Sequence, residues 1–157
     1  MMWKRRTKSV DETRDLGSEV SRVLQPGDVV LMTGTLGAGK TAFVQGVARG
    51  LGVIERVTSP TFTLVRQHQC DGTNGISVLH HADLYRTNSL DEIEDLTLSE
   101  LVAQGGIALI EWGEMGDPLF GDEVWKLSLE VISDDERLLT LTPPPGLDVD
   151  LAGWNPQ

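Results

Sequence analysis

The sequence has few of the features that mark secreted or membrane proteins. Its single cysteine, Cys70, excludes an internal disulfide framework and fits a reducing compartment. No apolar run approaches the roughly 18 residues of a membrane span. The basic start, MMWKRRTKSV, is not followed by the apolar segment of a secretory signal. We therefore expect a cytoplasmic protein that does not act at a membrane, and nothing beside Cys70 indicates a catalytic thiol.

Positive charge is scarce as well. The chain has 13 Lys and Arg residues against 24 Asp and Glu residues, a formal net charge of −11. Such a surface repels phosphate backbones, so direct binding of nucleic acid by the chain alone is not expected. If the protein acts in nucleic-acid metabolism, a partner is expected to hold the RNA or DNA. Solubility alone explains the same acidity equally well.

The length of 157 residues is sufficient for one domain with a buried core. We expect a solvated basic tail over residues 1–10, a folded domain over residues 11–142 and an extended proline-rich tail over residues 143–157.

Apolar spacing, turn residues and helix-ending glycines predict alternating helices and strands. Helices are expected over residues 11–24, 40–51 and 89–106. Strands are expected over residues 29–32, 62–69, 77–85, 107–112, 125–132 and 137–141, the last two as an antiparallel hairpin. This order predicts an α/β fold with a mixed, mostly parallel central sheet flanked by helices.

The stretch GTLGAGKT, Gly34 to Thr41, matches the phosphate-binding pattern G-x-x-x-x-G-K-[ST] without a mismatch. It lies between a predicted strand and a predicted helix, as that pattern requires. Backbone N–H groups freed by glycine can turn around phosphate oxygens, and the helix directs its positive end at the same anion. Lys40 is then expected to reach the β- and γ-phosphates, and the Thr41 hydroxyl to ligate Mg²⁺. The alternative is a glycine-rich turn followed by a surface lysine; the strand and helix around it favour a nucleoside triphosphate site.

A P-loop needs an acid at the end of a nearby strand to hold the metal. Glu111 follows the apolar strand IALI directly and is the expected residue, with Glu114 as the second choice. The position holds Glu where many P-loop proteins have Asp. The alternative is that this acid has no metal-binding role and is only the first solvent-exposed residue after a buried strand.

The segment HHADLYR, His80 to Arg86, gathers polar groups at the end of another predicted strand. Asp83 is a candidate for orienting the attacking water or for sharing the magnesium shell. Arg86 either steadies phosphate charge or pairs with a carboxylate. For His81 we favour a structural role, because ATP hydrolysis needs no imidazole. Upstream, SPTF (residues 59–62) fits either a structural turn or a switch loop.

Two other nucleotide-binding classes are disfavoured. The chain has no N-K-x-D guanine motif, and its D-x-x-G, Asp150 to Gly153, lies in the expected tail. A small-molecule kinase would carry an arginine-rich lid, whereas only Arg66 and Arg86 lie between residues 57 and 120. A P-loop kinase and a non-hydrolysing nucleotide-sensing module remain the alternatives to an ATPase.

The ordered motifs TRDLG, PGDVVLMTGTLGAGKT, SPTF, HADLYR, IEDLTLSEL and IEWGE resemble the bacterial TsaE (YjeE) family. That family is the ATPase component of tRNA threonylcarbamoyladenosine (t6A) biosynthesis. The similarity runs from about residue 11 to residue 141, nearly the whole expected domain.

The resemblance implies a compact P-loop fold that binds ATP or ADP with Mg²⁺ and hydrolyses ATP weakly on its own. It also implies partners: a TsaB–TsaD pair transfers the threonylcarbamoyl group to adenosine 37 of tRNA, and the ATPase docks on that pair. The chain would then meet tRNA only indirectly, through the complex.

By position, the resemblance implies that the phosphates are held by Leu36, Gly37, Ala38, Gly39, Lys40 and Thr41. It assigns Mg²⁺ to Thr41 and Glu111, hydrolysis to Asp83 with Lys40 and Glu111, and a place beside the nucleotide to Trp112. It places Asp11, Thr13 and Arg137 around the base. The chain departs from the family at Thr35, where Asp is frequent; this change removes a charge near the phosphates.

Overall fold

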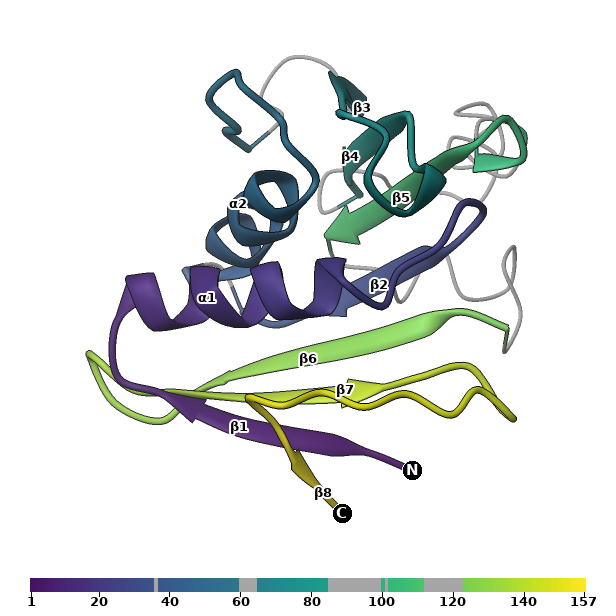
Figure 1. Ribbon diagram of the computed structural model, residues 1–157. Coiled ribbons are helices and arrows are strands. Elements are labelled where there is room, and N and C mark those ends of the chain that lie inside the picture. Colours follow the sequence, from purple (N-terminus) through teal and green to yellow (C-terminus); the bar gives the residue numbers. More distant parts are fainter. Residues whose placement is uncertain (36, 60–64, 85–99, 101, 112–122) are drawn as a thin grey trace.

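The fold is built on one mixed β-sheet (Figure 1). The computed structural model describes residues 1–35, 37–59, 65–84, 100, 102–111 and 123–157. Across the sheet the strands are β3 (Val65–Gln69), β4 (Val78–Asp83), β5 (Gly106–Glu111), β2 (Val29–Thr33), β6 (Trp125–Val131), β7 (Arg137–Thr142), β1 (Trp3–Thr7) and β8 (Asn155–Pro156). The four central strands, β4, β5, β2 and β6, run parallel, and the outer pairings are antiparallel. The expected α/β fold with a mixed sheet is confirmed, as is the antiparallel β6–β7 hairpin.

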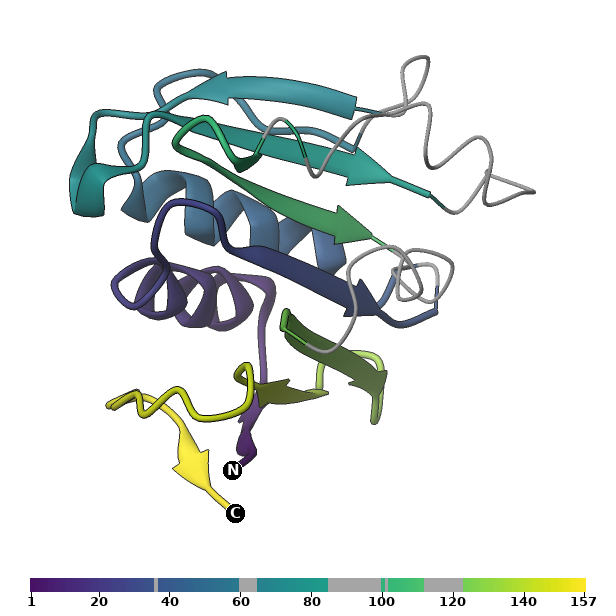
Figure 2. The same cartoon turned by 90° about the vertical axis from the view of Figure 1, so that its right-hand side faces the viewer.

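Two helices, α1 (Val10–Ser21) and α2 (Lys40–Gly50), pack side by side against the same face of the sheet (Figures 1 and 2). Their axes come close because glycine lies at the contact. A Cβ atom on Gly46 would collide with the backbone of Arg14. A short 3₁₀ turn, η1 (Thr73–Gly75), connects β3 to β4.

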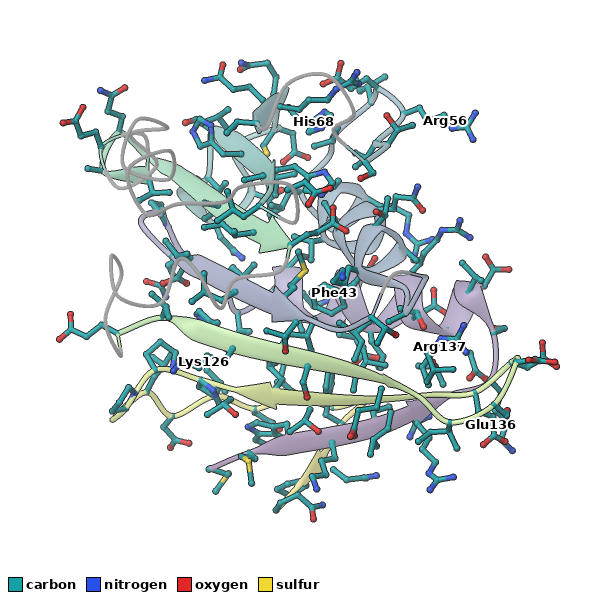
Figure 3. The ribbon with its side chains drawn as sticks, turned by 180° about the vertical axis from the view of Figure 1, so that it is seen from behind. Phe43, Arg56, His68, Lys126, Glu136 and Arg137 are labelled. Carbon is teal, nitrogen blue, oxygen red and sulfur yellow. The ribbon has the colours of Figure 1, made fainter. Side chains whose placement is uncertain are left out.

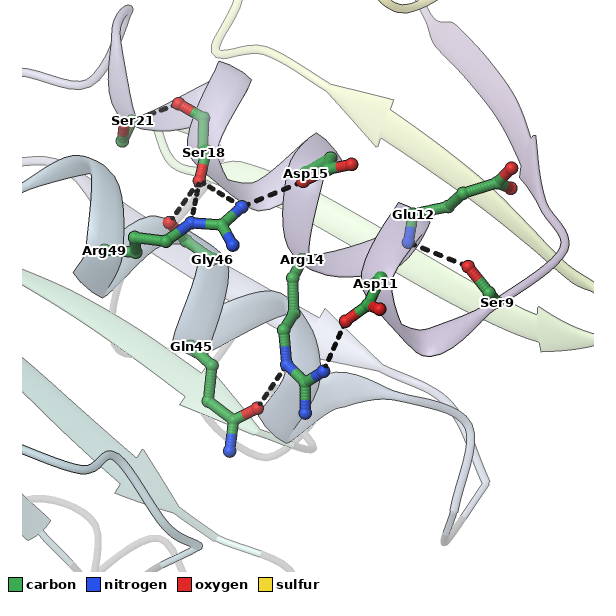
Figure 4. Close-up of polar contacts among 10 residues, drawn as sticks. All are labelled: Ser9, Asp11, Glu12, Arg14, Asp15, Ser18, Ser21, Gln45, Gly46 and Arg49. Atoms are coloured by element: carbon green, nitrogen blue, oxygen red, sulfur yellow. Dashed lines mark hydrogen bonds and ion pairs between the residues drawn. The ribbon is translucent and has the colours of Figure 1, made fainter.

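Polar contacts also join the two helices (Figure 4). The Ser18 hydroxyl donates to the Gly46 carbonyl at 2.9 Å, and Arg14 Nε donates to Gln45 Oε1 at 2.9 Å. Arg49 pairs with Asp15 at 2.9 Å on the exposed side of the contact. Such exposed ion pairs contribute little free energy, so the close helix packing rests mainly on the glycines and the apolar core.

The core has two layers because side chains alternate along each strand. On β2, Val30 and Met32 face the helices, while Val29 and Leu31 face the opposite side of the sheet. All four are buried, which explains the continuous apolar run of this central parallel strand.

The helix expected over residues 11–24 begins one residue earlier and ends at Ser21. Its first turn is capped by Ser9, whose hydroxyl accepts from the Glu12 N–H at 3.1 Å. The helix expected over residues 89–106 lies mostly outside the described residues, as do residues 62–64 and Tyr85 of the two strands expected around the CDGTNG turn.

The amino end differs from the expected solvated tail. Trp3 to Thr7 form β1, which pairs with β7 in antiparallel register, Trp3 opposite Leu141 and Thr7 opposite Arg137. Trp3 is 7% exposed and Thr7 1%. The basic residues between them conceal this pattern in the sequence, since only the two outer positions are buried.

The carboxyl end also differs from an extended tail. Leu151 and Trp154 are buried in the helix-side core, and Asn155–Pro156 form β8 against β1. The Gln157 N–H donates to the Met2 carbonyl at 2.7 Å, so the two termini lie together (Figure 1). Within the described residues, no helix has the length and apolar character needed to cross a membrane.

Replacement of Trp3 by Ala tests the place of β1 in the fold. Removing a buried Trp is expected to lower the free energy of unfolding by about 3–5 kcal/mol. The control is Met2→Ala, at a side chain that is 44% exposed, which should change it by less than about 0.5 kcal/mol. Urea unfolding followed by Trp fluorescence and circular dichroism measures both. Equal midpoints for the two variants would show that β1 is not part of the cooperative fold.

Candidate nucleotide site

The P-loop connects β2 to α2, and two of its glycines are required by the backbone. Gly39 caps the amino end of α2 with φ 106°, and Gly37 has φ 83°, both in the left-handed region that disfavours other residues. Gly34 is required for space, because a Cβ atom there would lie 2.8 Å from the Leu129 carbonyl oxygen on β6. The loop therefore takes its shape from β6 as well as from its own sequence.

Lys40 is the first residue of α2 and is 7% exposed. Its Nζ donates to the Gly34 carbonyl at 2.6 Å, so the ammonium group lies against the first residue of the loop. The Lys40 ammonium group is therefore bound within the loop and does not extend into solvent. This placement excludes the simpler reading of a surface lysine after a turn.

Glu111 ends β5 and faces the helix side of the sheet. Its carboxylate accepts from the Thr41 hydroxyl at 3.1 Å, and the residue is 4% exposed. The structure thus brings together the two residues expected to bind Mg²⁺, and both offer the oxygen ligands that Mg²⁺ prefers. No cluster of three or more His, Cys, Asp and Glu residues that could hold a metal occurs in the described part of the chain.

His81 contacts the second oxygen of the same carboxylate. Its Nε2 lies 2.7 Å from Glu111 Oε2, and His81 is fully buried. From the sequence a structural role is predicted for this histidine, and no local pattern connects it with Glu111.

Asp83 lies at the same edge of the sheet, opposite Glu111 in the parallel register of β4 and β5. The Ser59 hydroxyl, from the SPTF segment, lies 3.5 Å from Asp83 Oδ2. The two acids and the P-loop therefore share one end of the sheet. The role of Asp83 in hydrolysis stays a prediction.

A pocket of about 110 Å³ lies beside the P-loop. Its wall includes two of the expected base-binding residues, Thr13 from α1 and Arg137 from β7. Arg137 donates to the Ser133 carbonyl at 2.8 Å and to the Gly37 carbonyl at 3.4 Å, which joins the hairpin to the loop. Figure 3 shows it between that hairpin and the start of α1.

Asp11, the third expected base-binding residue, does not line this pocket. Its carboxylate is exposed and pairs with Arg14 at 2.9 Å. The pocket is instead lined by further residues that are not predicted from the sequence: Ser9, Val10, Ala42, Asp134 and Asp135. Of these only Ser9 carries a local signal, as the cap of α1; the two acids lie in a hairpin turn with no nucleotide-binding pattern.

Several expected site residues lie outside the described residues: Leu36, Arg86, Trp112, Glu114 and residues 60–62. Their roles stay predictions.

Cys70 is not activated as a nucleophile. Burial, and then the charge of Asp71, raise the pKa of its thiol to about 11. The thiol is therefore protonated at neutral pH, which agrees with the absence of a catalytic signal around it in the sequence.

Comparison with known proteins gives consistent matches. The family model described as "Threonylcarbamoyl adenosine biosynthesis protein TsaE" matches residues 7–139, a range that includes every site residue above. A protein of Treponema pallidum named tRNA threonylcarbamoyladenosine biosynthesis protein TsaE is 39% identical over 135 residues, which cover 86% of this chain and 96% of the relative. A Bacillus subtilis protein of the same name is 37% identical over 137 residues, covering 87% and 83%. The crystal structure of Bacillus subtilis YdiB superposes with a TM-score of 0.71 at 31% identity, over 92% of this chain and 86% of that one.

Replacement of Lys40 by Ala tests the phosphate-binding loop. The loss of a charge-assisted hydrogen bond costs on the order of 1.5–3 kcal/mol, so ATP affinity should fall roughly 10- to 150-fold. Isothermal titration with ATP measures the change, and Lys126→Ala, at an exposed lysine of β6, is the control. Unchanged ATP affinity in the Lys40 variant would falsify the loop assignment.

Proposed function

The chain belongs to the TsaE family of threonylcarbamoyl adenosine biosynthesis proteins, and from this membership we propose that it is the Mg²⁺-dependent ATPase of tRNA t6A formation. The membership confirms the resemblance seen in the sequence motifs. The observation that carries the ATPase proposal is the contact between Thr41 and the buried Glu111, directly beside the P-loop. A P-loop with a strand-end acid at this position is the arrangement that P-loop NTPases use to bind a nucleotide with Mg²⁺.

Each group has a distinct part in the proposed reaction. The P-loop N–H groups and Lys40 hold the phosphates, and Thr41 with Glu111 would hold Mg²⁺. When bound, Mg²⁺ supplies charge neutralisation at the β- and γ-phosphate oxygens. Asp83, at the same end of the sheet, would orient the attacking water.

The pocket between α1, the P-loop and the β6–β7 hairpin is the proposed site of the adenine base. Thr13 and Arg137 line it, and the guanidinium of Arg137 offers a planar surface for stacking. Asp134 and Asp135 lie at the same pocket and offer acceptors for an amino group. ATP and its product ADP would both fit, because the base and the first two phosphates are common to them.

The proposed partners are a TsaB–TsaD pair, on which the ATPase docks and whose turnover its nucleotide cycle supports. The net charge of −11 supports indirect contact with tRNA, because it opposes direct binding of an RNA backbone. In this proposal the chain hydrolyses ATP and does not carry out the transfer of the threonylcarbamoyl group.

The experiment that tests this proposal measures phosphate release from ATP by the chain alone and with the TsaB–TsaD pair. Slow release that rises sharply with the pair supports an accessory ATPase. Retention of the phosphate on an acceptor would instead identify a kinase. An Asp83→Ala or Glu111→Ala protein that fully supports t6A formation would identify a non-hydrolysing nucleotide sensor.

Replacement of Glu111 by Gln should separate binding from hydrolysis. The amide keeps the size of the side chain and removes its charge, so Mg²⁺-dependent phosphate release should fall by at least about tenfold. Nucleotide affinity measured without Mg²⁺ should stay within a few-fold of the unmodified chain. Glu130→Gln, at an exposed acid of β6, is the matched control and should hydrolyse normally. Normal hydrolysis by the Glu111 variant in the presence of the partners would show that Glu111 is not the metal-site acid.

A further inference from the structure

The Glu111 carboxylate is held at both oxygens by groups from two different elements. Thr41, at the start of α2, donates to Oε1 at 3.1 Å, and His81, on β4, contacts Oε2 at 2.7 Å. None of the lysines and arginines that the structure describes forms an ion pair with Glu111. A buried carboxylate depends on its hydrogen-bond donors, so these two contacts decide how it is oriented.

The chemistry of the pair fixes the direction of the histidine contact. A carboxylate that binds Mg²⁺ is ionised and can only accept hydrogen bonds, so in that state the His81 Nε2 contact requires the proton on Nε2, which donates to Oε2. The other ring nitrogen, Nδ1, is buried and has no partner among the described residues. Glu111 is thus the one hydrogen-bond partner of the His81 side chain in the described part of the chain, and this contact is what the buried imidazole provides.

The two contacts differ in what they do when a metal is present. The Thr41 hydroxyl is itself an expected ligand: it would bind Mg²⁺ through an oxygen lone pair while its proton stays available to Glu111. His81 lies on the other side of the carboxylate and has no such second use. Its bond to Oε2 can therefore persist and keep Oε1 directed at Thr41.

We propose that His81 is a positioning residue, which holds the Glu111 carboxylate in the orientation that Mg²⁺ binding requires. This proposal rests on the proposed function, because the orientation of Glu111 matters to the reaction only if the site binds a metal. Donors behind a metal-binding side chain typically change metal affinity or activity by about 10- to 100-fold when they are removed.

The chain offers a matched control at the preceding position. His80 is also on β4 and is 2% exposed, but it faces the opposite side of the sheet, where its ring lies close to Gly106. It has the same size and nearly the same burial as His81 without the contact to Glu111. A change at His80 therefore reports the general effect of altering a buried histidine on this strand.

The test compares His81→Leu, which removes the donor, with His81→Gln, whose amide nitrogen can reach the position of Nε2, and with the control His80→Leu. A fluorescent ATP analogue is titrated into each protein in EDTA and at a series of Mg²⁺ concentrations. Affinity in EDTA should be the same for all. The Mg²⁺ concentration that gives half of the Mg²⁺-dependent binding should rise about 10- to 100-fold in His81→Leu, return to within a few-fold in His81→Gln and stay unchanged in His80→Leu.

Three outcomes would overturn the proposal. An unchanged Mg²⁺ requirement in His81→Leu, with the unmodified chain still dependent on Mg²⁺, removes the positioning role and leaves the proposed function intact. Equal changes in His81→Leu and His80→Leu assign the effect to packing. An unmodified chain that binds no nucleotide overturns the proposed function, and this proposal with it. If thermal melting shows that His81→Leu is unfolded, His81→Asn, whose shorter amide cannot reach Glu111, takes its place in the same comparison.

Discussion

The parallel pairing of β4, β5 and β2 brings the carboxyl ends of three strands to one edge of the sheet, and the proposed nucleotide site depends on that alignment. In this register Glu111 lies opposite Met32 on one side and Asp83 on the other. The chain leaves β2 at that edge through the P-loop, and Thr41, at the start of α2, therefore lies within hydrogen-bond distance of Glu111. A slip of one residue in either pairing would turn the acid to the opposite face of the sheet, away from α2.

Close packing of α1 on α2 positions the residues of the proposed base pocket, as the strand register positions Glu111. The helices approach at Gly17 and Gly46, where a Cβ atom on either would collide with the backbone of the other helix. This contact holds α1 beside α2, with Thr13 of α1 at the pocket next to Gly39. β1, which leads directly into α1, ties the same helix to β7, and β7 carries Arg137. The proposed base pocket is therefore built from both ends of the chain, although the phosphate loop is local.

The phosphate loop is local in sequence, whereas the base pocket combines distant segments. This difference explains which site residues could be predicted from the sequence. Thr41, Lys40 and Glu111 depend on short patterns: a glycine loop before a helix, and an acid after a buried strand. The contact between Arg137 and Gly37 joins positions 100 residues apart and depends on the path of the β6–β7 hairpin, which no local pattern specifies. The two terminal strands, β1 and β8, are not predictable from the sequence for a related reason. Trp3 lies in β1, which pairs with β7, and Trp154 directly precedes β8, which pairs with β1. Both pairings join distant parts of the chain, whereas charge and proline dominate the local composition at the two ends.

The two adjacent histidines of β4, His80 and His81, cannot be distinguished by residue type. By composition they are equivalent, and because ATP hydrolysis needs no imidazole, the chemistry of the reaction selects neither. The alternation of the strand separates them: His81 reaches the buried acid, while His80 lies on the far face. Donors behind a metal-binding side chain orient it, so the hydrogen bonds of Glu111 identify the residues on which its orientation depends. One of these contacts comes from His81, a residue that has no catalytic role of its own in ATP hydrolysis.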